Sequence, residues 1–83
     1  MPQKTCTETE LAAVAKRFRK RAGVTRAQAA RDMGVSQTSI FHAEESPEQA
    51  LLKLRARMIE KYSPFMVIGP VFCLRRKKLF PPH

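Results

Sequence analysis

Apolar residues recur at helical spacing soon after the start of the chain. Leu11, Val14 and Phe18 fall on one face of a helix, and Thr7 supplies a capping residue immediately before it. The stripe is about as wide as the apolar face of a surface helix that packs on a core. This pattern predicts a helix over residues 8–22.

Two shorter helical segments follow, separated by three residues that begin with Gly34. Thr25 and Ser36 are hydroxyl residues of the kind that cap helix starts, and each precedes a short stretch with an apolar inner face. Gly34 suits the left-handed position that ends a helix. We therefore predict helices over 26–33 and 37–44.

A fourth helix is predicted over 47–61. Ser46 and Pro47 resemble an N-cap followed by a first-turn proline. The apolar positions of this segment, which include Leu54 and Met58, cover more than one narrow stripe. We expect part of this helix surface to pack on the domain and part on a second copy of the chain.

The pattern changes after residue 63. Residues 65–68 and 71–74 are β-prone, and Gly69-Pro70 between them is a turn signal. Two short strands or one bent strand fit this pattern, and because an isolated hairpin is only marginally stable, the strands need a covering helix or a second subunit. The residues predicted to form a dimer are Leu54, Met58, Phe65, Val67, Val71 and Phe72.

The charge balance points to polyanions as partners. Sixteen Lys and Arg residues against seven Asp and Glu residues give a formal net charge of +9 and a pI near 10.4. Nucleic acid is the commonest such partner, and an anionic membrane surface comes second. With 43% hydrophobic residues the chain has enough apolar side chains for a core. A core of 83 residues is marginal, which favours oligomerisation.

Several kinds of chemistry are disfavoured. Cys6 and Cys73 lie near opposite ends of the chain, without the clustering that zinc requires. Residues 1–10 lack a secretory apolar run, so we expect a cytoplasmic protein with free thiols. The apolar run 65–74 is too short for a membrane span. No nucleophile–base set or phosphate-binding loop is present, so we expect neither an enzyme nor a metal or other cofactor.

The residues around Gly34 carry a resemblance to a known family. Ala30 is small where two helices cross, Gly34 suits a left-handed turn, and Val35 and Ile40 are apolar where side chains fill the angle between helices. In this spacing, the segment 25–44 resembles the helix-turn-helix of Cro and the phage repressors, the XRE class of transcriptional regulators. The resemblance extends over about half of the chain.

The chain departs from that class in two places. Residues 45–47 lead straight into the fourth helix, where the class commonly has a longer loop. The class also commonly has a fifth helix where this chain is β-prone. Operator choice and dimer geometry therefore cannot be transferred from the resemblance.

The resemblance implies that the second helix of the motif reads DNA bases. The chemistry of its exposed residues agrees, because an amide can pair with adenine, a methyl or ring can lie against thymine, and an imidazole can bond a base edge. The helix start at Ser36 has free N–H groups and a partial positive charge that can bind a DNA phosphate. The predicted base-reading residues are Gln37, Thr38, Phe41 and His42. The predicted phosphate-contacting residues are Arg19, Arg26, Ser36, Arg75, Arg76 and Lys77.

Together these patterns predict a mainly α fold, a four-helix helix-turn-helix DNA-binding domain followed by a short C-terminal β-hairpin or strand that pairs in a dimer. The expected divisions are an N-terminal tail (1–7), the helical domain (8–62), a β segment for dimerisation (63–75) and a basic tail (76–83). The predicted function is a repressor that binds an inverted repeat in double-stranded DNA as a homodimer.

Alternatives stand beside these assignments. Phe41 also fits a role in completing the core, and His42 by itself is typical of an ordinary surface histidine. Arg75–Lys78 also fits a solvated basic tail. A protein-interaction module, such as an antitoxin whose C-terminal segment binds a partner protein, is the main competing function. Attachment to a membrane surface through residues 75–80 is a weaker third option.

Overall fold

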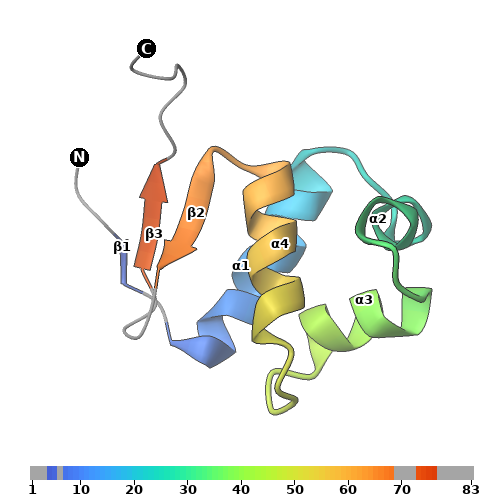
Figure 1. Cartoon of the computed structure of the whole chain (residues 1–83), viewed down its shortest axis with the longest axis horizontal. Helices are drawn as coiled ribbons and strands as arrows, with labels where there is room; N and C mark the ends of the chain where they lie inside the picture. Colours follow the sequence, from blue (N-terminus) through green and yellow to red (C-terminus); the bar gives the residue numbers. More distant parts are fainter. Residues whose placement is uncertain (1–3, 6, 69–72, 77–83) are drawn as a thin grey trace.

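A computed structural model describes residues 4–5, 7–68 and 73–76 of the chain. These residues form a compact, mainly helical fold with a small sheet (Figure 1). The helices are α1 (Glu8–Arg21), α2 (Arg26–Met33), α3 (Gln37–Glu45) and α4 (Leu52–Tyr62). The strands are β1 (Lys4–Thr5), β2 (Phe65–Ile68) and β3 (Cys73–Arg76).

The starts of the first three helices are where the sequence predicts them. Thr7 and Glu10 form a complete capping box at α1, and the side chains of Thr25 and Ser36 accept hydrogen bonds from backbone N–H groups at α2 and α3. Gly34 has φ of +72°, the left-handed conformation that ends α2. The local hydroxyl and glycine signals therefore locate these boundaries to within one residue.

The predicted start of α4 is wrong. The sequence predicts the helix from Pro47, whereas α4 begins at Leu52 and residues 46–51 form a turn-rich connection. The Arg55 guanidinium, fully buried, donates to the carbonyls of Ala43, Ser46 and Gln49 at 2.8 Å each. The bonds to Ser46 and Gln49 satisfy carbonyl groups of the connection, and the bond to Ala43 ties the connection to the last turn of α3. The short loop inferred after α3 is corrected for the same reason.

The core lies between the helices and closes against the sheet. α1 and α4 pack side by side at its centre, and the inner faces of α2 and α3 complete it. Leu54 is 8% exposed and Met58 is fully buried, so the prediction that these residues contact a second copy is wrong. The buried apolar cluster consists of Leu11, Val14, Ala15, Phe18, Ala29, Ala30, Met33, Ile40, Ala43, Leu54, Met58, Ile59 and Leu74.

The strands form an antiparallel sheet in the order β1-β3-β2. Val67 pairs with Leu74, and Phe65 stacks on Phe18 with ring centroids 5.8 Å apart, so one sheet face covers the end of the core. Phe65 and Val67, both predicted at a dimer interface, pack against the core of their own chain and stay only partly buried, so their part in a dimer stays a prediction. β1 lies in the segment predicted as an N-terminal tail. The described strands pair within one chain, with β3 between β1 and β2.

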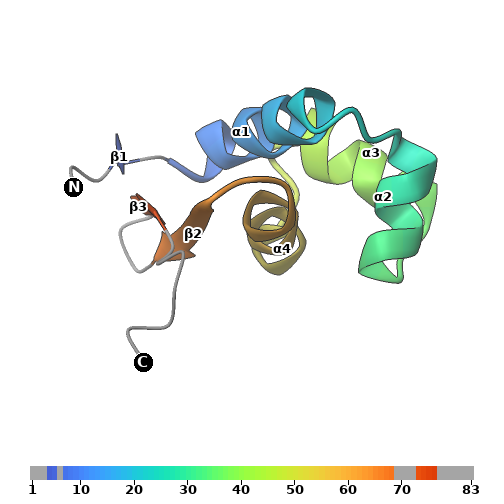
Figure 2. The same ribbon diagram turned by 90° about the horizontal axis from the view of Figure 1, so that it is seen from above.

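The sheet and the α2–α3 pair lie at opposite ends of the molecule, with α1 and α4 between them (Figures 1 and 2). This arrangement separates the C-terminal strand from the predicted base-reading helix. Val71, Phe72 and Lys77 lie outside the described residues. None of the helices in the described part of the chain is both long and apolar enough to cross a bilayer.

Candidate nucleic-acid interface

The connection between α2 and α3 sets how the two helices cross. Gly34 reverses the chain, and the Val35 N–H then donates to the carbonyl of Ala30 at 3.0 Å. Ala29 and Ala30 are both buried, and their small side chains let α3 approach α2 closely. The Ser36 side chain accepts from the Ser39 N–H at 3.1 Å, which fixes the first turn of α3.

One face of α3 is exposed and chemically varied. Gln37 and Thr38 are exposed in the first turn, and Phe41 is 43% exposed one turn later. Ile40 and Ala43 on the opposite face are fully buried. α3 is therefore held by its apolar side and presents an amide, a hydroxyl and an aromatic ring to solvent. The alternative that Phe41 fills the core does not agree with this exposure.

His42 lies at the edge of this face and is half-buried. Its Nδ1 atom is 2.9 Å from the Ser46 hydroxyl and 3.3 Å from Nε2 of Gln49. The imidazole also meets the Phe41 ring edge-on, with ring centroids 5.5 Å apart. The connection after α3 thus orients the imidazole. An ordinary surface histidine would have no such partners.

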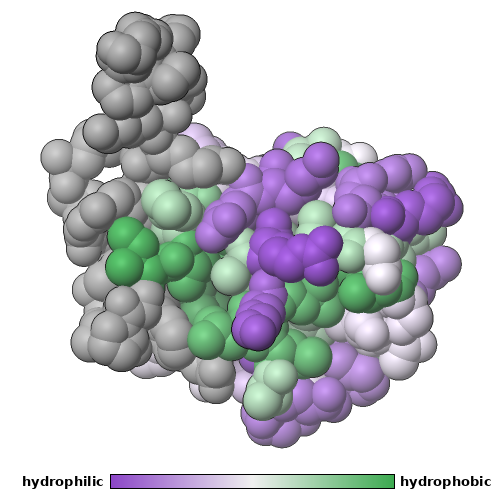
Figure 3. Space-filling view, viewed as in Figure 1, coloured by the Kyte–Doolittle hydropathy of each residue, from purple (hydrophilic) through white to green (hydrophobic). Residues whose placement is uncertain are grey.

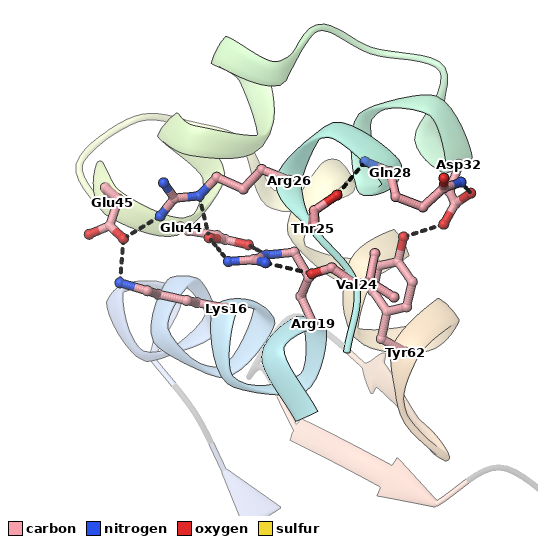
Figure 4. Close-up of polar contacts among 10 residues, drawn as sticks. All are labelled: Lys16, Arg19, Val24, Thr25, Arg26, Gln28, Asp32, Glu44, Glu45 and Tyr62. Carbon is pink, nitrogen blue, oxygen red and sulfur yellow. Dashed lines mark hydrogen bonds and ion pairs between the residues drawn. The ribbon is translucent and has the colours of Figure 1, made fainter. Parts of the chain in front are cut away.

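A buried carboxylate fastens α3 to the rest of the domain. The Glu44 side chain is fully buried, and it accepts from Nε and Nη2 of Arg19, the latter at 3.1 Å (Figure 4). A further nitrogen of Arg19 donates to the Val24 carbonyl at 2.7 Å. This network joins α1, the loop after it and α3. Because the charges and donors are matched, their burial is tolerated.

Arg26 extends the same network to the surface. Its Nε donates to Glu44 at 3.0 Å and its Nη2 to Glu45 at 2.9 Å, while its guanidinium lies 5.1 Å from the centre of the Phe41 ring. Lys16 contacts the Glu45 carboxylate from α1. The hydrogen bond from Lys16 is the main cause that holds the pKa of Glu45 below its ordinary value.

The structure revises the predicted phosphate contacts. Arg19 is only 7% exposed and its guanidinium is engaged by Glu44 and Val24, so its assignment to phosphate is wrong. Arg26 keeps a third of its side-chain surface exposed. Arg75 and Arg76 belong to β3, at the end of the molecule opposite α3 (Figure 1). A DNA duplex bound to α3 would therefore not contact β3 on the same face of the protein.

The candidate interface is thus the exposed side of α3 with the Ser36 helix start and the partly exposed Arg26. No protein-family model, curated protein or solved structure matches this chain. The interpretation of this surface rests on its own geometry and chemistry.

Sequence reasoning missed the charged residues that hold this surface in place. Glu44 appears in the sequence as one polar residue at the end of α3, and nothing local marks it as buried. Arg55 carried a usable signal. It stands four residues after Leu51 and four before Ile59, an inward position on a helix. A cation at such a position predicts a buried guanidinium with several carbonyl partners.

Proposed function

We propose that this protein is a sequence-specific DNA-binding transcriptional regulator, a repressor that places α3 in the major groove. The observation that carries the proposal is the exposed face of α3 with Gln37, Thr38 and Phe41, on a helix whose opposite face is buried. An α-helix fits into the major groove of B-form DNA. The resemblance of residues 25–44 to the helix-turn-helix of Cro and the phage repressors supports the same proposal.

The residues of this face match base-edge chemistry. The Gln37 amide can donate to and accept from adenine, and Thr38 and Phe41 offer apolar surface for the thymine methyl. His42 is oriented by Ser46 and can present its other ring nitrogen to a base edge. Base reading by these residues is the specific part of the proposed function.

Phosphate contacts supply the less specific part. The start of α3 at Ser36 carries free N–H groups and the positive end of the helix dipole. Arg26 is held by two carboxylates and keeps a third of its side-chain surface exposed, which suits a positioning contact to a phosphate beside α3. The net charge of +9 favours association with any duplex and makes it salt-sensitive.

The proposed regulator acts as a homodimer on an inverted repeat. Two copies of α3 would enter successive major grooves about 34 Å apart on one side of the duplex. Such a dimer would use surfaces other than Leu54 and Met58, which are buried in each chain.

The experiment is a selection of binding sites from random duplexes, followed by a salt titration of the selected and unselected pools. The proposal requires an enriched site that binds more tightly than random DNA near physiological salt. Equal binding to both pools, lost together as salt rises, would leave only a basic surface and would refute sequence-specific regulation.

A further inference from the structure

A groove opens between the α2–α3 turn, α3 and the first two turns of α4. Its volume is about 750 Å³. Val35, Leu51 and Leu52 are all only half-buried in its wall, so each leaves apolar surface in contact with water. The residues that line the groove are Val35, Ser39, Ala50, Leu51, Leu52, Lys53, Leu54 and Arg57.

The charges that line the groove have one sign. Lys53 is exposed and makes no ion pair among the described residues, and Arg57 lies one turn further along α4. Arg57 Nη2 donates to the Met33 carbonyl at 2.8 Å, so the end of α2 holds this guanidinium in place. None of the described lining residues is acidic. Hydrophobic surface and strongly hydrophilic side chains accordingly lie next to each other over α4 (Figure 3).

We propose that this groove binds an acidic amphipathic segment of a partner protein. Apolar side chains from one face of the segment occupy the space between Val35, Leu51 and Leu52, and Asp or Glu residues beside them meet Lys53 and Arg57. A groove of this volume is in the range of ligand-binding sites and accepts the anchors that a short helix presents at i, i+3 and i+4. The groove lining does not include the proposed base readers Gln37, Thr38, Phe41 and His42, although Ser39 in its wall contacts Ser36 at the start of α3. Binding of the segment does not require DNA.

The charges favour such a partner over a second copy of this chain. In a two-fold symmetric contact the same patch faces itself, so Lys53 and Arg57 of each copy would approach their counterparts. Each chain also carries a net charge of +9. A like-charge contact of this kind lowers affinity, whereas an acidic segment gains attraction from the same residues.

The test is a selection of random peptides of about twelve residues, roughly three helical turns, against the full-length protein. We expect selected peptides to combine Leu or Phe at helical spacing with Asp and Glu. Leu52→Gln should weaken their binding about tenfold through lost apolar contact. Lys53→Glu should weaken it about fivefold through charge reversal.

Matched controls separate the groove from general attraction to a basic protein. Lys20→Glu makes the same charge change at an exposed position of α1 that does not line the groove, and Met66→Gln changes an apolar residue that is 38% exposed on β2. Both should change peptide affinity less than about twofold. Ala50→Glu, at an exposed groove position, should weaken binding without removing any buried side chain, which guards against a folding defect in Leu52→Gln.

Three results would overturn the proposal. One is a selection that enriches no acidic amphipathic peptide. Another is a loss of affinity in Lys20→Glu as large as in Lys53→Glu, which would mean that only net charge attracts the peptides. The third is a dimer in sedimentation velocity that Leu52→Gln and Ala50→Glu both dissociate, which would assign the groove to a second copy. DNA affinity of the same variants, measured in parallel, reports on the proposed regulator function separately.

Discussion

Arg19 and Glu44, 25 positions apart in sequence, form a two-point ion pair that joins α1 to α3 beside the core. The Glu44 side chain has no exposed surface, and Arg26 donates to the same carboxylate from α2. Three helices therefore meet at one buried charge. The orientation of the exposed face of α3 depends on this pair, because Glu44 lies in the last turn of the same helix and fastens it to α1 and α2.

Removing the buried carboxylate should destabilise the fold strongly. Glu44→Gln leaves the guanidinium of Arg19 buried without a compensating charge, and breaking a buried pair in this way typically costs about 3–5 kcal/mol. Urea unfolding followed by circular dichroism measures the change in the free energy of unfolding. Glu48→Gln, at an exposed position, is the control and should stay within about 0.5 kcal/mol of the parent. Similar values for the two variants would contradict the structural role of Glu44.

Arg55 should contribute as much to the free energy of unfolding as an apolar core residue of the same helix. Arg55→Met removes the donors to the carbonyls of Ala43, Ser46 and Gln49, and the buried acceptor at Ala43, left without a partner, alone costs about 1–3 kcal/mol. Arg55→Lys keeps the charge but lacks the planar fork that reaches several carbonyls, so it should also destabilise the protein. Thermal unfolding tests both variants against Lys53→Ala. A melting temperature unchanged in Arg55→Lys would show that charge alone suffices at this position.

The link between α2 and α4 predicts an acid-dependent contribution to stability. The Tyr62 hydroxyl donates to Asp32 at 2.7 Å, and this hydrogen bond is the main cause that lowers the pKa of Asp32 from its ordinary value of 3.8. Because the folded pKa is the lower one, the stabilisation is complete above the unfolded value and is lost as pH falls below it.

Tyr62→Phe tests that link directly. We expect the pKa of Asp32, followed by NMR of its carboxyl carbon, to rise toward 3.8 in the variant. The loss of stability below that pH should become less steep than in the parent. The pKa of Glu45, which depends on Lys16, serves as the internal control and should not move. An unchanged pKa of Asp32 in the variant would show that the hydrogen bond from Tyr62 does not lower it.

The proposed base readers and the basic tail should act differently on DNA. Gln37→Ala and Thr38→Ala should each reduce discrimination between the selected site and random duplex by about 1–3 kcal/mol. Lys77→Ala should instead weaken binding to both duplexes about equally and reduce the slope of affinity against salt. Fluorescence anisotropy with both duplexes at several salt concentrations measures these effects. If all three variants behave alike, α3 does not read the sequence.

Boundaries that depend on neighbouring residues were predictable. The capping box of Thr7 with Glu10, the hydroxyls of Thr25 and Ser36, and the left-handed Gly34 are local devices, and each operates where the sequence indicates. The start of α4 was not predictable in this way. Ser46 and Pro47 have the local features of a helix start, but the bonds from Arg55 to three carbonyls determine the path of the chain there.

The sequence by itself determined the mainly helical character, the positions of α1 to α3 and the choice of Gln37, Thr38 and Phe41 as exposed residues of α3, because these follow from spacing and caps within a few residues. Only the tertiary structure decided that Arg19 is buried, that Leu54 and Met58 belong to the core, and that β3 pairs with β1 and β2 of the same chain. The physical reason is that burial and pairing of these residues depend on partners far along the chain. Arg19 would be an exposed cation on an isolated helix. The carboxylate that pairs with its buried guanidinium comes from α3.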